Sequence, residues 1–277
     1  MQQRPFQCQR RFNQLFKILL SATLSSHNRE ELLRHALNII ESLFKWFNEN
    51  DLVVNPAKTH IMEFKIRNCK DLPDLALNIN GVDIYSSSET KFLGLIIDRN
   101  LTFTNHKDWV CKKLSSGIFV LRQLSTFLSS DVLLTAYYGL VYPFLSYAVP
   151  IWGYQSTSSQ FIFRLQKKAI RAVFGKPSRA SWKPLFADNG ILTFPSIYIL
   201  STVLFVHKHL HLFAEIAPPS HQYNLRPNNS IQVPVHKTSF YEHHLRFTGI
   251  KLYNALPDSV KTESNINTFK TNWRTIC

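Results

Sequence analysis

Residues 89–98, ETKFLGLIID, form a short and nearly all-apolar run between polar ends. Such a run is typical of a strand that is buried on both faces. Gly94 interrupts it where a larger side chain would improve packing, and a glycine inside a strand often marks a bulge or a close approach by another backbone or a ligand. The run therefore predicts a buried strand with a close approach at Gly94.

The residues before this strand predict a small α+β unit. Asn28, with Glu31 three residues later, favours a helix start, and apolar residues at helical spacing continue to Phe47. A strand is expected at residues 60–64. A hairpin is expected at residues 75–84, because apolar residues alternate there on both sides of an NG turn. With the strand at residues 91–98 these pieces form a small antiparallel or mixed sheet against one helix.

After residue 105 the apolar spacing becomes mainly helical. Residues 106–175 are predicted to form one helical region and residues 176–277 a C-terminal extension. Within the extension, proline-rich residues 217–240 predict an irregular connector. Further helical pieces are expected near residues 249–253 and 266–273.

One predicted helix carries a one-sided cluster of basic residues. Apolar residues on its opposite face are expected to meet the core, and residues 132–187 contain no Asp or Glu to neutralise the bases. This pattern favours contact with nucleic-acid phosphates over a face that is merely solvated. The basic residues are Arg164, Lys167, Lys168 and Arg171, and the apolar ones are Phe161, Leu165, Ala169 and Ala172.

The overall balance of charge points to a polyanionic partner. The 277 residues include 32 Lys and Arg against 18 Asp and Glu, a formal charge of +14, and hydrophobic residues make up 45%, enough for a sizeable core. Such an excess favours binding to RNA or DNA, although ribosomal contacts or anionic membranes fit the charge equally well.

The scattered cysteines indicate reduced thiols and therefore an intracellular protein, cytoplasmic or nuclear. They are Cys8, Cys69, Cys111 and Cys277. No apolar run has the length of a membrane span, so no membrane partner is expected. The histidines show no ligand spacing for a metal.

The first 27 residues are basic and contain no Asp or Glu. We expect them to be a poorly ordered leader. A mitochondrial presequence has a similar composition and is the alternative interpretation.

Four motifs in order resemble the C-terminal half of reverse transcriptases from LINE-type non-LTR retrotransposons, the Jockey-like group and its relatives. The first lies at residues 46–59, WFNENDLVVNPAKT, and resembles motif D. The opening stretch, with Lys91, Phe92, Leu93, Gly94 and Asp98, resembles motif E. Residues 137–153 resemble the thumb segment, and residues 166–171 with residues 253–257 resemble the tail of such proteins. The implied fold is α+β, with a partial palm at residues 28–105 and a helical thumb at residues 106–175.

The resemblance also implies roles for particular residues. Lys58, with Asn55 nearby in motif D, lies near the incoming triphosphate in the intact family and assists the loss of pyrophosphate. Residues 91–94 correspond to the primer grip, and the basic helix contacts template or primer phosphates without reading sequence. Trp109 and Trp152 are candidates for base stacking, with core packing as the favoured interpretation.

The catalytic residues of that family have no counterpart in this sequence. In the family an FADD or YADD turn precedes the first helix and holds two metal ions, Mg²⁺, through its carboxylates. Residues 18–21 occupy that place and read ILLS. Asp188, in FADN at residues 186–189, follows the thumb-like segment and is not expected to be catalytic. We therefore expect no catalytic residue, metal site or cofactor in this chain.

The leading hypothesis is a remnant of an RNA-directed DNA polymerase that cannot polymerise alone, with the upstream catalytic region lacking. One alternative is a non-enzymatic basic protein that binds RNA or DNA. Another is a mitochondrial or ribosome-associated structural protein. A partial palm would leave sheet edges exposed, so self-association is also expected.

Overall fold

A computed structural model describes most of the chain and shows two compact units. The described residues are 22–26, 28–55, 59–64, 76–79, 82–154, 156–214, 231–236, 239–262 and 268–269. The first unit comprises Met1–Ile61 with Leu72–Ser86, and the second comprises Met62–Asp71 with Ser87–Cys277. No described helix is long and apolar enough to cross a membrane.

The first unit contains helix α1 (Arg29–Glu49) and a hairpin of β1 (Ala76–Ile79) and β2 (Val82–Tyr85). The helix begins where predicted, because the Asn28 side chain accepts a hydrogen bond from the backbone N–H of Glu30 at 3.0 Å. The antiparallel hairpin is also confirmed. Its predicted turn, residues 80–81, lies outside the described residues.

The core of the first unit is small. Ile84 of β2 is its one buried hydrophobic residue among those described, and partly buried residues of α1, with Ile61, pack against it. The strand predicted at residues 60–64 is wrong, since only Ile61 forms a bridge, to Ser86. The Ile61–Ser86 bridge is parallel, so residues 62–64 would have to pair with residues after Ser86. Because β2 ends at Tyr85, it offers residues 62–64 no strand to pair with.

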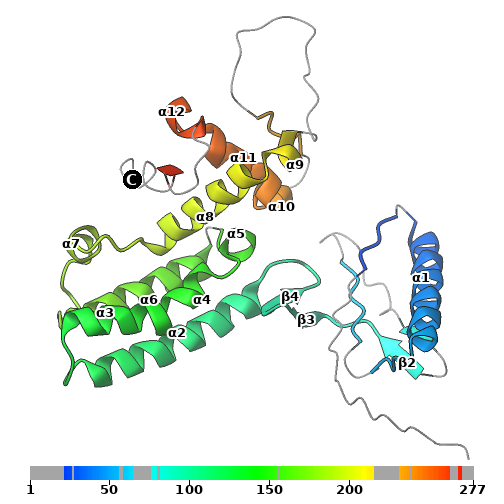
Figure 1. The fold of residues 1–277 in the computed structure, drawn as a ribbon, viewed down its shortest axis with the longest axis horizontal. Coiled ribbons are helices and arrows are strands. Elements are labelled where there is room, and N and C mark those ends of the chain that lie inside the picture. The colour runs from blue at the N-terminus through cyan, green and yellow to red at the C-terminus, as the bar shows by residue number, and fades with distance from the viewer. Residues whose placement is uncertain are drawn as a thin grey trace, which may run out of the picture. The chain divides into compact units, whose positions relative to one another are not determined.

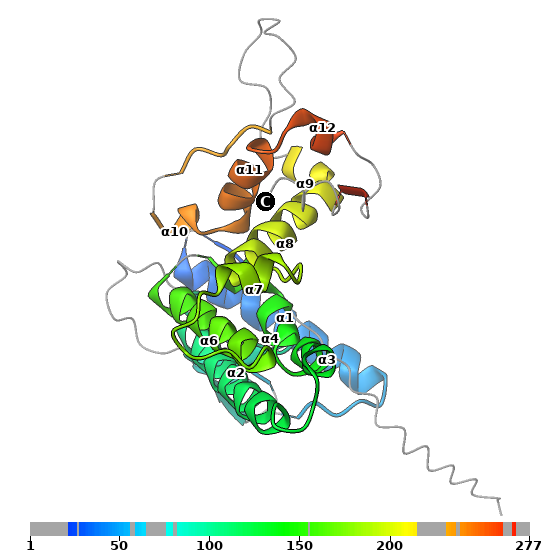
Figure 2. The ribbon, with the colours of Figure 1, turned by 90° about the vertical axis from the view of Figure 1, so that its left-hand side faces the viewer.

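The second unit begins with a β-hairpin and continues as helices. The hairpin consists of β3 (Glu89–Phe92) and β4 (Leu95–Asp98). The first group of helices is α2 (Thr104–Leu124), α3 (Ser130–Leu140), α4 (Tyr142–Ser146), α5 (Val149–Trp152) and α6 (Thr157–Val173). The remaining helices are α7 (Lys183–Ala187), α8 (Phe194–Lys208), α9 (Leu210–Ala214), α10 (Ser239–Glu242), α11 (Leu245–Asn254) and α12 (Asp258–Lys261). Helices α2, α3, α4 and α6 lie side by side, with the hairpin beside the start of α2 (Figure 1, Figure 2).

The stretch at residues 89–98 is a hairpin, so the prediction of one continuous buried strand is wrong. Leu93 and Gly94 form its two-residue turn with φ of +47° and +85°. Positive φ at both positions is the pattern of a type I′ turn, which matches the twist of the flanking strands. Gly94 therefore reverses the chain. The hairpin forms its own two-stranded sheet and does not pair with β1 or β2, contrary to the sheet predicted against the first helix.

Asp98 at the end of β4 organises the entry to α2. Its carboxylate accepts hydrogen bonds from the backbone N–H groups of Asn100 at 3.1 Å, Thr102 at 3.0 Å and Phe103 at 2.7 Å. Leu101 and Phe103 in this connection have positive φ, a conformation that side chains other than glycine rarely adopt. The carboxylate thus stabilises a strained connection between hairpin and helix.

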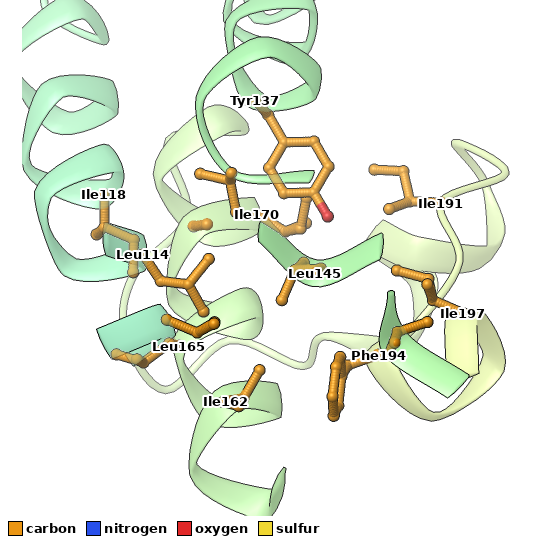
Figure 3. Packing of buried hydrophobic residues seen from close by; sticks show 14 of the residues in the cluster. Leu114, Ile118, Tyr137, Leu145, Ile162, Leu165, Ile170, Ile191, Phe194 and Ile197 are labelled. Atoms are coloured by element: carbon orange, nitrogen blue, oxygen red, sulfur yellow. The ribbon is translucent and has the colours of Figure 1, made fainter. Parts of the chain in front are cut away.

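The main core of the second unit lies between α2, α3, α6 and the start of α8 (Figure 3). Leu114 and Ile118 of α2 contribute to the same cluster as Ile162 and Ile170 of α6. The fully buried side chain of Gln166 is satisfied within it, because its amide donates to the Tyr137 hydroxyl at 3.0 Å and accepts from the Phe194 N–H at 2.7 Å. This network joins three helices through one side chain.

A second cluster joins α8, α9, α11 and α12. The helix predicted near residues 249–253 is confirmed by α11. The predicted connector is irregular at residues 231–236, whereas α10 begins at Ser239, and the intervening part of 217–240 lies outside the described residues. Of the helix predicted at residues 266–273, only residues 268–269 are described, and both are helical.

Candidate nucleic-acid interface

Helix α6 presents its four predicted basic residues on one side and its apolar residues to the core. It begins at Ser156, whose hydroxyl accepts from the Ser159 N–H at 3.2 Å. Leu165 and Ala169 are buried as predicted, but Phe161 is 46% exposed, so its assignment to the core is wrong. Phe161 lies three residues before Arg164 and therefore shares the basic side of the helix.

The four basic residues have different surroundings. Arg164 and Lys168 are exposed, and neither makes an ion pair within the described part of the chain. The Nε of Arg171 donates to the carbonyl of Ala180 at 2.9 Å, and the Nζ of Lys167 lies 4.5 Å from the centre of the Phe163 ring. Arg171 and Lys167 thus support structure, while Arg164 and Lys168 are available to a ligand.

Partial burial, followed by the nearby guanidinium groups of Arg171 and Arg164, lowers the pKa of Lys167. Its ammonium group also lies 5.4 Å from the centre of the Trp182 ring, so two aromatic rings partly compensate for lost hydration. The charges of Arg164 and Arg171 thus disfavour the charged form of Lys167.

The loop after α6 extends the basic side. Gly175, at φ +57°, ends the helix in a Schellman arrangement, in which the Lys176 N–H donates to the Arg171 carbonyl at 2.9 Å. Beyond it, Lys176, Arg179 and Lys183 are exposed. Because residues 132–187 contain no Asp or Glu, the positive charge of helix and loop is not neutralised from within this stretch.

The primer-grip-like residues 91–94 form the end of β3 and the turn of the β3–β4 hairpin. Lys91, Leu93 and Gly94 are exposed and Phe92 is half-buried. The hydroxyl of Tyr147 donates to the Leu93 carbonyl, and a Cβ placed on Gly94 would lie 3.4 Å from Cε1 of Tyr147. The close approach predicted at Gly94 is therefore made by Tyr147, from the thumb-like segment of the same unit.

Lys91 also reaches a tryptophan of α2. Its Nζ lies 5.7 Å from the centre of the Trp109 ring, and the Nζ of Lys113 lies at the same distance. Trp109 is partly buried, whereas Trp152 is 0% exposed and donates its indole N–H to the Tyr147 carbonyl at 2.9 Å. The core interpretation is thus confirmed for Trp152, and Trp109 packs against the same core cluster while staying partly exposed.

The motif-D-like residues belong to the first unit. Asn55 lies in irregular backbone after α1, and Lys58 lies outside the described residues. Asp188, from the sequence that resembles a catalytic turn, is exposed at the end of α7 while Phe186 beside it is buried.

Helix α2 contains two buried titratable residues, His106 and Lys107, that the sequence pattern did not predict. Burial, with the charge of Lys107 as a smaller cause, lowers the pKa of His106 to about 4, and burial lowers the pKa of Lys107 to about 8. The Lys107 ammonium donates to the Ser156 hydroxyl at 3.1 Å and lies 3.8 Å from the centre of the Tyr154 ring. Its position three residues before Val110, on the apolar side of α2, was the available signal.

No group of three or more His, Cys, Asp or Glu within the described ranges is arranged to hold a metal ion. Residues 18–21, which the resemblance aligns with the metal-binding turn, lie outside the described part of the chain. His207 of α8 stacks on Phe269 with ring centres 4.4 Å apart, so this histidine serves packing.

Comparison with known proteins gives two informative matches. A segment of 178 residues is 29% identical to the probable RNA-directed DNA polymerase from transposon BS of Drosophila melanogaster and covers 61% of this chain and 19% of that protein. A segment of 144 residues is 28% identical to the RNA-directed DNA polymerase from mobile element jockey of Drosophila funebris, with 50% and 15% covered. The matched segments thus span less than a fifth of either protein. No family model and no solved structure matches the chain.

Proposed function

We propose that this chain, which is related to the RNA-directed DNA polymerases of Jockey-like non-LTR retrotransposons, binds the backbone of RNA or DNA through helix α6. Arg164 and Lys168 are the leading contacts. The observation that supports this proposal most directly is that both side chains are exposed and make no ion pair among the described residues. Both lie within residues 132–187, which contain no Asp or Glu. Phosphate contacts of this kind position a nucleic acid without reading its sequence.

Helix α6 is a firm support for such contacts. Its opposite side is anchored in the main core through Ile162, Leu165 and Ile170, so the basic side chains project from a fixed backbone. Side chains four residues apart, like Arg164 and Lys168, are separated along the axis by about 6 Å. Successive phosphates of a nucleic-acid backbone can therefore meet the two basic side chains, Arg164 and Lys168.

Salt-dependent binding tests this proposal. The logarithm of the binding constant should fall linearly with the logarithm of the salt concentration, and the Arg164→Ala, Lys168→Ala double variant should reduce the slope by about two for duplex DNA. Lys208→Ala, which removes an exposed lysine from α8, is the matched control and should change the slope of the salt dependence much less. Lack of binding at low salt, or equal slopes for all three proteins, would contradict the proposal.

We further propose that the chain by itself does not extend a primer. The support is chemical: residues 1–27 contain no Asp or Glu, although the resemblance places the metal-binding turn just before α1. A primer-extension assay with Mg²⁺ or Mn²⁺ should yield no product. Extension that is lost in a Lys58→Ala variant would overturn this proposal, because Lys58 occupies the motif-D position.

The family relationship also supports, as a proposal, a partial palm in residues 28–105 and a thumb-like region from residue 106. In that arrangement the turn at residues 91–94 would hold a primer end. A non-enzymatic role in RNA or DNA binding would use the same surface of α6. A mitochondrial role rests on the first 27 residues alone, and import of a reporter fused to them would distinguish it.

A further inference from the structure

We propose that Trp109, flanked by Lys91 and Lys113, is a stacking site for a base of single-stranded RNA or DNA. Trp109, Lys91 and Lys113 together form what we call the Trp109 platform. The inference rests on the proposed function, because it adds a base contact to the phosphate contacts of α6. It concerns different side chains, so the two can fail separately.

The indole ring of Trp109 is held in place from behind and from the side. His106 stacks against it with ring centres 5.8 Å apart and an interplanar angle of 22°. Phe144 of α4 meets it edge-on at 5.7 Å. Because His106 is buried and its pKa is lowered to about 4, it is neutral at physiological pH and supports the ring without adding charge. His106 thus lies against one face of a ring that also packs on the main core, and a base would have to stack on the part of the indole that stays exposed.

Two ammonium groups from different elements lie over the same ring. Lys91 extends from β3 and Lys113 from one turn further along α2, and each Nζ lies 5.7 Å from the ring centre. Neither lysine makes an ion pair within the described part of the chain. Glu89, two residues before Lys91, is hydrogen-bonded to Asn105, and Asp108 is exposed beside Trp109.

An aromatic face between two cations has the chemistry that a single strand requires. A base stacks on the ring while the phosphates on either side of it meet the ammonium groups, and the sequence of the strand matters little because every base has a π-face. Lysines that only shield an indole from water would produce the same geometry without a ligand. The distinguishing property is dependence on the bases of the strand.

The test compares an ordinary single-stranded oligonucleotide of about 12 nucleotides with a strand of equal length in which every base is removed. Full-length Trp109→Ala should bind the ordinary strand about tenfold more weakly than the native chain and bind the abasic strand equally well. Trp109→Phe keeps an aromatic face and should retain most of the affinity. Arg164→Ala with Lys168→Ala should weaken both strands alike.

Fluorescence provides a second readout that does not depend on the alanine variant being folded. The ordinary strand should quench the indole emission of the native chain more than that of Trp109→Phe, and the abasic strand should quench neither. Equal loss of affinity for both strands in Trp109→Ala, or no loss for either, would overturn the platform. If the α6 variant still weakens binding in that case, the proposed function stands without the platform.

Discussion

At the scale of single residues, several positions that the family resemblance marks have structural tasks in this chain. Asp98 caps the strained connection into α2, Gly94 forms a turn beneath Tyr147, and Trp152 is fully buried. Gly153, which follows Trp152 in the thumb-like segment, also has a structural task. A Cβ at Gly153 would lie 2.5 Å from Cγ2 of Val149 and 2.7 Å from its carbonyl oxygen.

Gly153→Ala is therefore expected to destabilise the second unit. Forcing a methyl group into backbone and a packed side chain costs about 1–3 kcal/mol, and urea denaturation would measure the loss. Gly139→Ala in α3 is the matched control, because a Cβ there meets nothing within 4 Å. The control should be stabilising by about 0.5–1 kcal/mol, and equal behaviour of the two variants would contradict the packing argument.

Lys107 predicts a dependence of stability on pH. Its pKa is lowered by burial from 10.5 to about 8 in the folded chain, so between these values the unfolded chain binds more protons than the folded one. Stability must then rise as the pH increases through this window and be flat with respect to this group below it. The rise should amount to a few kcal/mol, at about 1.4 kcal/mol for each pKa unit.

Denaturation of the native chain and of Lys107→Met between pH 7 and pH 11 would measure this contribution. The variant replaces the ammonium group by an uncharged side chain of similar length and should lose the rise. A rise of the same size in both proteins would assign it to other groups.

At the scale of elements, two basic residues of α6 help to hold the loop between α6 and α7, beside the packing of Trp182 on Phe163. Arg171 donates to the Ala180 carbonyl, and Lys167 lies over the ring of Trp182. Lys176, Arg179 and Lys183 are exposed here. Proline follows both lysines, so of these three residues only Arg179 is followed by a peptide bond that trypsin cleaves. The conformation of this loop therefore depends in part on two basic residues that a sequence pattern assigns to ligand binding.

Arg171→Ala is expected to accelerate tryptic cleavage after Arg179 several-fold. Loss of a hydrogen bond from a charged donor costs about 1.5–3 kcal/mol when the bond is well formed, and local opening becomes more frequent accordingly. Limited proteolysis followed by mass spectrometry measures it. Arg164→Ala removes a neighbouring base without a structural bond, so equal acceleration in both variants would exclude this role of Arg171.

At the scale of the whole molecule, charge and open sheet edges act in opposite directions. The formal charge of +14 keeps copies of the chain apart at low ionic strength. Both sheets have only two strands among the described residues, so backbone groups at their edges are available for pairing. Screening of the charge should therefore reveal self-association.

Light scattering should show an apparent mass that increases as salt is raised from low to physiological concentration and above. Tyr85→Lys places a charge at the exposed end of β2 and should reduce the increase. Phe127→Lys, at an exposed apolar position between α2 and α3, is the comparison. Loss of association only in the Phe127 variant would assign it to an apolar surface instead of a sheet edge.

The sequence by itself predicted several of the helical segments and the resemblance to a polymerase family. Helix α1 starts at Asn28, α6 carries its bases on one side, and α11 lies where the spacing of apolar residues predicts it, because such periodicities are local properties of the chain. The order of weak motifs sufficed to predict the relationship to Jockey-like polymerases that the two matches support.

Only the tertiary structure decided the conformation of the opening stretch and the surroundings of the four basic residues of α6. A run of apolar residues with one glycine is compatible with a strand or a hairpin, and the hydroxyl of Tyr147, 54 residues away, meets the chain at the turn. Arg171 and Lys167 differ from Arg164 and Lys168 because Arg171 donates to a backbone carbonyl and Lys167 lies near aromatic rings. The spacing of basic residues along the helix does not show these contacts. Such contacts join residues distant in sequence, and their geometry follows from packing, which no local pattern encodes.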